Sequence, residues 1–189
     1  MRLFLSLPRR AAMQQFGRAL FALASLALLP PSAARAEQEE TWRFYRNATP
    51  PFTVLYPASL PTKHIGKRTA PDTLLVQEWQ LPGGAGDIRL MIDDVPAGTS
   101  LADWTKAHIS GEAMASDVAG MPAASVENLA DGVYTTTVFI SEAKSGKVIS
   151  FALAIRNLPP GTTLAAAKAQ NRAQVTQFWR MVESLKMDE

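Results

Sequence analysis

Short, turn-rich links join the β-rich segments of this chain, and they restrict its fold more than any other feature of the sequence. Prolines and glycines at 82–86, the pair Asp131-Gly132 and the segment 144–146 separate runs of branched or alternating apolar residues. Links of this length join antiparallel neighbours, because parallel strands need a crossover of about a dozen residues or more. The sequence therefore predicts a largely antiparallel sheet.

The predicted strands follow from composition and from two-residue periodicity. We expect them at 41–45, 52–56, 73–81, 87–95, 124–129, 133–141 and 148–156. In the segment 87–95, isoleucine and leucine alternate with charged residues and methionine, so one face of that strand is strongly apolar. One side of the sheet is therefore expected to be covered by other elements.

Two main helices are predicted to pack on this sheet. Ser100 and Asp103 form a capping box, which is typical of a helix start, and this helix should run to about residue 110. The interpretation of residues 111–122 stays open, with a further helical turn as one alternative. A long final helix begins at Thr162 or Thr163 and carries an apolar stripe at helical spacing. The expected fold class is α+β, with about six to seven strands in a largely antiparallel sheet.

Residues 1–36 have the order of a secretory signal peptide. Arginines precede the apolar run 19–29, and Ala34 and Ala36 supply the small residues needed for a cut after Ala36. The run is about half as long as a bilayer span requires, so we expect export and cleavage rather than an anchor. Arg9-Arg10 keeps a twin-arginine route open beside the general secretory one. The predicted organisation is a cleaved signal peptide at 1–36 and a single α+β domain at 37–189 in the bacterial periplasm.

Removal of the signal peptide changes the charge of the protein. Its five arginines reduce the 19 basic residues to 14, against 17 acidic ones. A net acidic domain lacks the concentrated basic face that nucleic-acid binding needs, so we expect no nucleic-acid partner. The absence of cysteine excludes disulfides, thiol catalysis and thiolate metal sites.

Four segments of the chain carry a resemblance to a known family. The segments 52–57, 95–101, 120–123 and 178–186 are similar to the corresponding parts of the PsbP-like fold family, and the resemblance covers nearly all of residues 41–186. It implies a single α+β domain without shared catalytic residues. Members of the family mostly bind or assemble other proteins, so the resemblance implies a binding role and fold positions only.

The search for catalytic or metal-binding patterns is negative. His64 and His108 are the only histidines, and they lack the paired spacing of zinc ligands. His108 follows Trp104 by one helical turn, so we expect it in or half-buried against the core. A Ser-His-Asp triad stays open because its members assemble in space, although no nucleophile elbow is present. Asp93-Asp94 is expected at a strand end facing water. We therefore expect no catalytic residues, no metal site and no cofactor.

One segment favours a binding role. Residues 57–72 lack a clear period and are expected to form a connection longer than compact domains usually keep. Lys63, His64, Lys67 and Arg68 crowd within it, although the domain is net acidic. A solvated loop is one interpretation. The other is a docking loop for an acidic protein surface or anionic head groups, because local positive charge accelerates association.

These observations lead to three functional hypotheses. The first is a non-enzymatic binding or assembly module that contacts an envelope protein partner, with an acidic surface as the expected target. Contact with a membrane surface, without an anchor, is left open. The alternatives are a periplasmic hydrolase with an unrecognised site and a small-ligand carrier that uses the space between sheet and helices.

Overall fold

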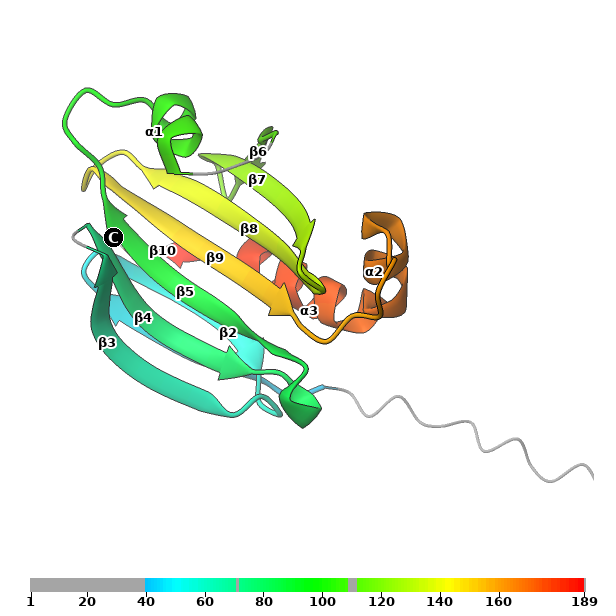
Figure 1. Ribbon diagram of the computed structural model, residues 1–189. Coiled ribbons are helices and arrows are strands. Elements are labelled where there is room, and N and C mark those ends of the chain that lie inside the picture. The colour runs from blue at the N-terminus through cyan, green and yellow to red at the C-terminus, as the bar shows by residue number, and fades with distance from the viewer. Residues whose placement is uncertain (1–39, 71, 109–111, 189) are drawn as a thin grey trace, which may run out of the picture. The chain divides into compact units, whose positions relative to one another are not determined.

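The computed structural model describes residues 40–70, 72–108 and 112–188. The predicted signal peptide lies outside the described residues. Within them, the chain forms ten strands in two sheets, three α-helices and one short 3-10 turn (Figure 1). The predicted α+β fold class with a largely antiparallel sheet is therefore confirmed.

Seven strands form the larger sheet. They are β3 (Thr62–Ala70), β4 (Thr73–Gln80), β5 (Gly86–Asp94), β6 (Met114–Val118), β7 (Met121–Ala130), β8 (Val133–Glu142) and β9 (Lys147–Ile155). Their order is β3-β4-β5-β9-β8-β7-β6, and every neighbouring pair is antiparallel. The helical turn considered for residues 111–122 is wrong, because β6 occupies residues 114–118 as an exposed edge strand.

Three strands form a second sheet. They are β1 (Trp42–Ala48), β2 (Pro51–Pro57) and β10 (Lys186–Met187), in the order β1-β2-β10. β10 joins the first strands of the domain to its last residues, since Lys186 pairs with Thr53 and Met187 with Phe52. The first two predicted strands therefore exist but do not belong to the main sheet.

The helices are α1 (Leu101–His108), α2 (Leu164–Gln170) and α3 (Arg172–Glu183). The capping box of α1 is confirmed, because the Asp103 N–H donates to Ser100 Oγ at 3.1 Å and Ser100 Oγ donates to Asp103 Oδ2 at 2.6 Å. The predicted final helix is interrupted at Asn171, whose backbone is not helical. Its side-chain amide donates to the Ala167 carbonyl at 2.9 Å and so ends α2.

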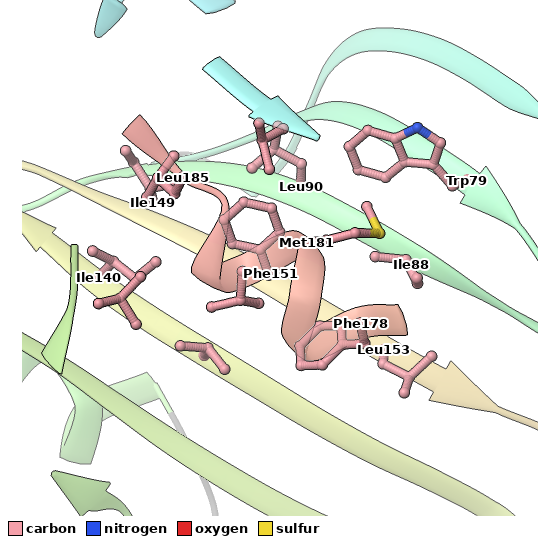
Figure 2. Close-up of a cluster of buried hydrophobic side chains, with 14 of the residues drawn as sticks. Trp79, Ile88, Leu90, Ile140, Ile149, Phe151, Leu153, Phe178, Met181 and Leu185 are labelled. Atoms are coloured by element: carbon pink, nitrogen blue, oxygen red, sulfur yellow. The ribbon is translucent and has the colours of Figure 1, made fainter. Parts of the chain in front are cut away.

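The core lies between the seven-stranded sheet and a layer made of α3 and the three-stranded sheet, which lie behind it in Figure 1. We call the covered face of the larger sheet its inner face. Figure 2 shows Phe178, Met181 and Leu185 among the apolar side chains of the strands. Phe178 and Met181 are completely buried. Their burial confirms that the apolar stripe of the final helix packs on the sheet.

A polar contact fastens α2 to the inner face of the sheet. Lys168 Nζ on α2 lies 2.8 Å from Glu127 Oε1 on β7, and the hydroxyl of the fully buried Tyr134 donates to the same oxygen at 3.1 Å. Burial, with the nearby Glu127 charge, raises the pKa of Tyr134. The phenol therefore stays neutral and serves as a donor.

The opposite, outer face of the larger sheet is covered at one end by α1 (Figure 1). Trp104 packs there against Phe139 and Val148 in a small cluster separate from the main core. No helix among the described residues has the length and apolar character needed to cross a bilayer.

Candidate functional site: the basic edge strand

The four predicted partner-binding residues lie on β3, at one edge of the seven-stranded sheet. Lys63, His64, Lys67 and Arg68 are all exposed. We expected an irregular connection here, and this is wrong, because β3 pairs along its length with β4. The sequence gives no periodic signal because both faces of the strand are open to solvent, and periodicity requires one buried face.

An irregularity divides β3 into two basic parts. The register with β4 shifts between His64 and Lys67, where Gly66 has a φ of 55°. This left-handed conformation suits glycine because it has no Cβ. A Cβ built on Gly66 would lie 3.5 Å from Nε2 of His64, so the imidazole lies beside the irregularity. Lys63 and His64 precede it, while Lys67 and Arg68 follow it.

Two lysines of the strand point to the outer face of the sheet. Lys63 lies across from Glu78, which in turn lies across from Arg89 on β5. Cross-strand partners share a face, and Arg89 alternates with the inward-facing residues of β5. Lys67 lies across from Leu75, and Leu75 lies across from Met91, which is on the same face of β5 as Arg89. Lys67 therefore also lies on the outer face.

The carboxylate nearest to Lys63 in the ladder is engaged elsewhere. Glu78 Oε2 lies 3.3 Å from Nε of Arg89. Within the described part of the chain, no carboxylate oxygen lies within ion-pair distance of Lys63 or Lys67. Both ammonium groups are therefore available to a partner.

Arg68, in contrast, is tied to its own domain. Its Nη2 lies 3.5 Å from Asp94 Oδ2, and Lys147 forms an ion pair with the other oxygen of Asp94. The hydrogen bond from Lys147 opposes the effect of burial and, together with the charges of Lys147 and Arg68, holds the pKa of Asp94 below its usual value. Arg68 therefore anchors the far end of β3 to the end of β5.

A second ion-pair network lies on the outer face beside the basic strand. Asp87 on β5 is 2% exposed and lies between two arginines. Its Oδ1 is 2.9 Å from Nε of Arg89, and its Oδ2 is paired with Arg156. Because Glu78 shares Arg89, the positive charges of this network are matched by carboxylates within the domain. The network therefore supports the sheet and adds no net positive charge to the site.

The prediction that Asp93 faces water is wrong. Asp93 is 5% exposed, and it accepts hydrogen bonds from Thr73 Oγ1 at 2.5 Å and Ser150 Oγ at 2.9 Å. These hydroxyls come from the two strands that flank β5, so the carboxylate links three neighbouring strands. Asp93 is thus a structural acceptor, and Asp94 is the partly exposed member of the pair.

The two histidines do not share a site. His64 lies on the edge strand β3, whereas α1, which carries His108, contacts β7 near the other edge. His108 is more exposed than we expected. Its ring stacks on Trp104 at a centroid distance of 4.1 Å, and Nδ1 lies 2.7 Å from the Trp104 carbonyl oxygen. The indole therefore covers one face of the imidazole without burying it.

Three comparisons place this geometry among known proteins. The sequence matches no protein-family model and no curated protein. The structure is similar to cyanobacterial PsbP (CyanoP) from Synechocystis sp. PCC 6803, with a TM-score of 0.55 and 14% identity over 79% of this chain and 94% of that one. A second similar structure is the Ran-binding protein Mog1p of Saccharomyces cerevisiae, with a TM-score of 0.48 and 12% identity over 78% of this chain and 96% of that one.

At these identities, similarity of structure shows the fold and nothing further. The chain therefore has a PsbP-like α+β fold, as the sequence resemblance implied. The sequence had also indicated the basic residues of the site. It had not indicated the roles of Glu78, Asp94 and Lys147, which depend on the registers of β4 with β5 and of β5 with β9.

Proposed function

We propose that this chain is an exported, periplasmic, non-enzymatic binding or assembly module that acts through protein–protein contacts. In this proposal β3 docks an acidic surface of an envelope protein. The observation that carries it is an ordered edge strand, exposed on both faces, whose Lys63 and Lys67 lack carboxylate partners within the described residues.

Local charge supports this role for β3. The domain that follows residue 36 has more acidic than basic residues, so β3 is a positively charged strand in a domain whose net charge is negative. A compact cationic strand in a net acidic domain attracts an acidic patch and orients it during diffusional encounter. Lys63 and Lys67 share the outer face, so both can contact one partner surface.

The export part of the proposal rests on the amino-terminal sequence. Residues 1–36 combine a basic start, a short apolar run and small residues before Glu37. The lack of cysteine is compatible with a domain that does not depend on disulfides in an oxidising compartment. The intact mass of the protein recovered from periplasm tests this part, and a species that retains residues 19–29 would contradict it.

The binding part is tested by quantitative affinity capture from the native envelope. Three tagged proteins are compared: wild type, Lys63→Ser with Lys67→Ser, and Lys106→Ser with Arg172→Ser. The last variant removes the same charge from exposed helix positions away from β3. We expect that acidic proteins are captured by wild type and by the helix variant, and that the β3 variant captures smaller amounts of them. Equal capture by all three proteins would contradict docking on β3.

A further inference from the structure

The backbone of β3 presents hydrogen-bonding groups to the open side of the sheet. The Gln80 N–H donates to the Pro61 carbonyl at 2.9 Å, which defines Pro61 and Gln80 as a hydrogen-bonded pair. Hydrogen-bonded and non-hydrogen-bonded pairs alternate along an antiparallel ladder. Lys63 therefore directs its N–H and C=O toward β4, whereas Thr62 and His64 direct theirs away from the sheet.

This open edge differs in its charge from β6, the other edge of the same sheet, because β6 carries Asp117 and no basic residue. Among the described residues, β3 pairs with β4 alone and its side chains are mostly exposed, so its second edge has no strand partner. Lysines on an edge strand discourage pairing with a second copy, because like charges would come together across the new ladder. The same lysines favour a segment that carries carboxylates at alternate positions. The charges of β3 therefore match an acidic extended segment better than a second copy of the strand.

We propose that the partner of β3 binds as an added strand, through main-chain hydrogen bonds to Thr62 and His64, with its acidic side chains placed beside Lys63 and Lys67. This inference rests on the proposed function and specifies how the partner is held. Addition of a strand to a sheet edge obtains affinity from the backbone and specificity from alternate side chains. The irregularity at Gly66 limits regular pairing to the first part of β3.

A substitution at His64 separates the backbone contribution from that of the side chain. Because the His64 N–H faces away from β4, His64→Pro removes a donor to the partner and leaves the hydrogen bonds with β4 in place. His64→Ala is the matched control, since it removes the imidazole and keeps the N–H. Far-UV circular dichroism and thermal unfolding establish that both variants fold.

The probe is a fluorescein-labelled peptide of sequence (Glu-Val)3-Glu, whose binding is followed by fluorescence polarisation at low salt. We expect His64→Pro to raise Kd about three- to tenfold, as loss of one main-chain hydrogen bond would, and His64→Ala to change it less than about twofold. Equal binding by the two variants, or no binding of the probe to the wild-type chain, would overturn strand addition.

Two modified probes test the same inference on the unchanged protein. Methylation of the backbone nitrogens of the valines blocks one edge of the peptide, and methylation of the internal glutamates blocks the other. An added strand uses a single edge, so one probe should lose binding and the other should keep it. Equal behaviour of the two probes would contradict strand addition.

The charge variant distinguishes this inference from the proposed function. If Lys63→Ser with Lys67→Ser weakens binding while His64→Pro and His64→Ala bind alike, charge-guided docking stands and strand addition fails. If the lysine variant binds the probe as tightly as wild type at low salt, the proposed role of the lysines fails as well.

Discussion

Lys63 on β3 lies directly across the ladder from Glu78 on β4, yet Glu78 is engaged by Arg89 at 3.3 Å rather than by the lysine. Arg89 lies on β5, which flanks β4 on the side away from β3. Glu78 is therefore neutralised by a residue other than Lys63. Lys63 is left exposed at the edge. The positive character of β3 is therefore a consequence of cross-strand register and not of composition alone.

The first prediction is that the basic edge contributes little to stability. Changing Lys63 and Lys67 together to serine should alter the free energy of unfolding by no more than about 0.5 kcal/mol per site, because exposed residues without buried contacts rarely contribute more. Urea denaturation at neutral pH measures this. A loss of several kcal/mol would show that the two lysines hold β3 on the sheet.

The second prediction concerns the packing of α3. Phe178 is fully buried and lies among the side chains of the sheet (Figure 2). Phe178→Ala should lower the free energy of unfolding by about 3–5 kcal/mol, because it leaves a cavity that the neighbouring strands cannot fill. Leu164→Ala on α2 is the control, since Leu164 is 37% exposed and should have a much smaller effect. Equal effects of the two substitutions would place α3 outside the core.

The third prediction is a pH dependence that originates at Glu142. Its carboxylate is 7% exposed and accepts hydrogen bonds from the backbone N–H groups of Lys144 at 3.0 Å and Ser145 at 2.6 Å. Burial raises the pKa of Glu142, but the hydrogen bonds from Ser145 and Lys144 outweigh it and hold the pKa below 4.5.

The sign of this dependence follows from the lowered pKa. The contribution of Glu142 to stability is complete above the pKa of the unfolded chain and is lost as the pH falls through the folded value. Glu142→Gln should therefore be less stable than wild type near pH 7, and the difference should shrink as the pH is lowered from about 5 to 3. Urea denaturation across this range measures it, with the exposed Glu112→Gln as control. A difference that grows at low pH would contradict the assignment.

The fourth prediction tests the close contact between β5 and β9. A Cβ on Gly86 would lie 1.8 Å from the Ala154 carbonyl oxygen, a distance that no side chain tolerates. Gly86→Ala should therefore destabilise the domain more than Gly146→Ala, which adds a Cβ at a φ of 65° with no atom within 4 Å. We expect about 1–2 kcal/mol for the control, from backbone strain alone. Thermal unfolding compares the two, and equal shifts would contradict a tight β5–β9 contact.

The parts of the fold that sequence could predict are those with one buried face. In β5, Ile88, Leu90 and Ile92 alternate with residues of the outer face, and the strand lies where the pattern indicated. The turn at Asp131-Gly132 and the capping box of Ser100 were predicted for local reasons, since both depend on residues adjacent in the chain.

The parts that sequence could not predict depend on contacts between distant residues. β3 and β6 have mostly exposed side chains and are held by their ladders, so no periodicity distinguishes them from loops. The burial of Asp93 depends on hydroxyls from two other strands, which only the register brings together. The basic residues of the site could be seen in the sequence. The ion pair with Arg89 that engages Glu78, the carboxylate across from Lys63, could not.

The salt dependence of association tests the central claim most directly. The association rate constant is measured by stopped flow for an acidic protein recovered by the envelope capture, with wild type, with Lys63→Ser plus Lys67→Ser, and with the helix control Lys106→Ser plus Arg172→Ser. At low salt we expect the β3 variant to associate several-fold more slowly than the other two proteins. This difference should shrink above about 0.15 M salt as the charges are screened. Equal rate constants for all three proteins at low salt would contradict docking of an acidic partner on β3.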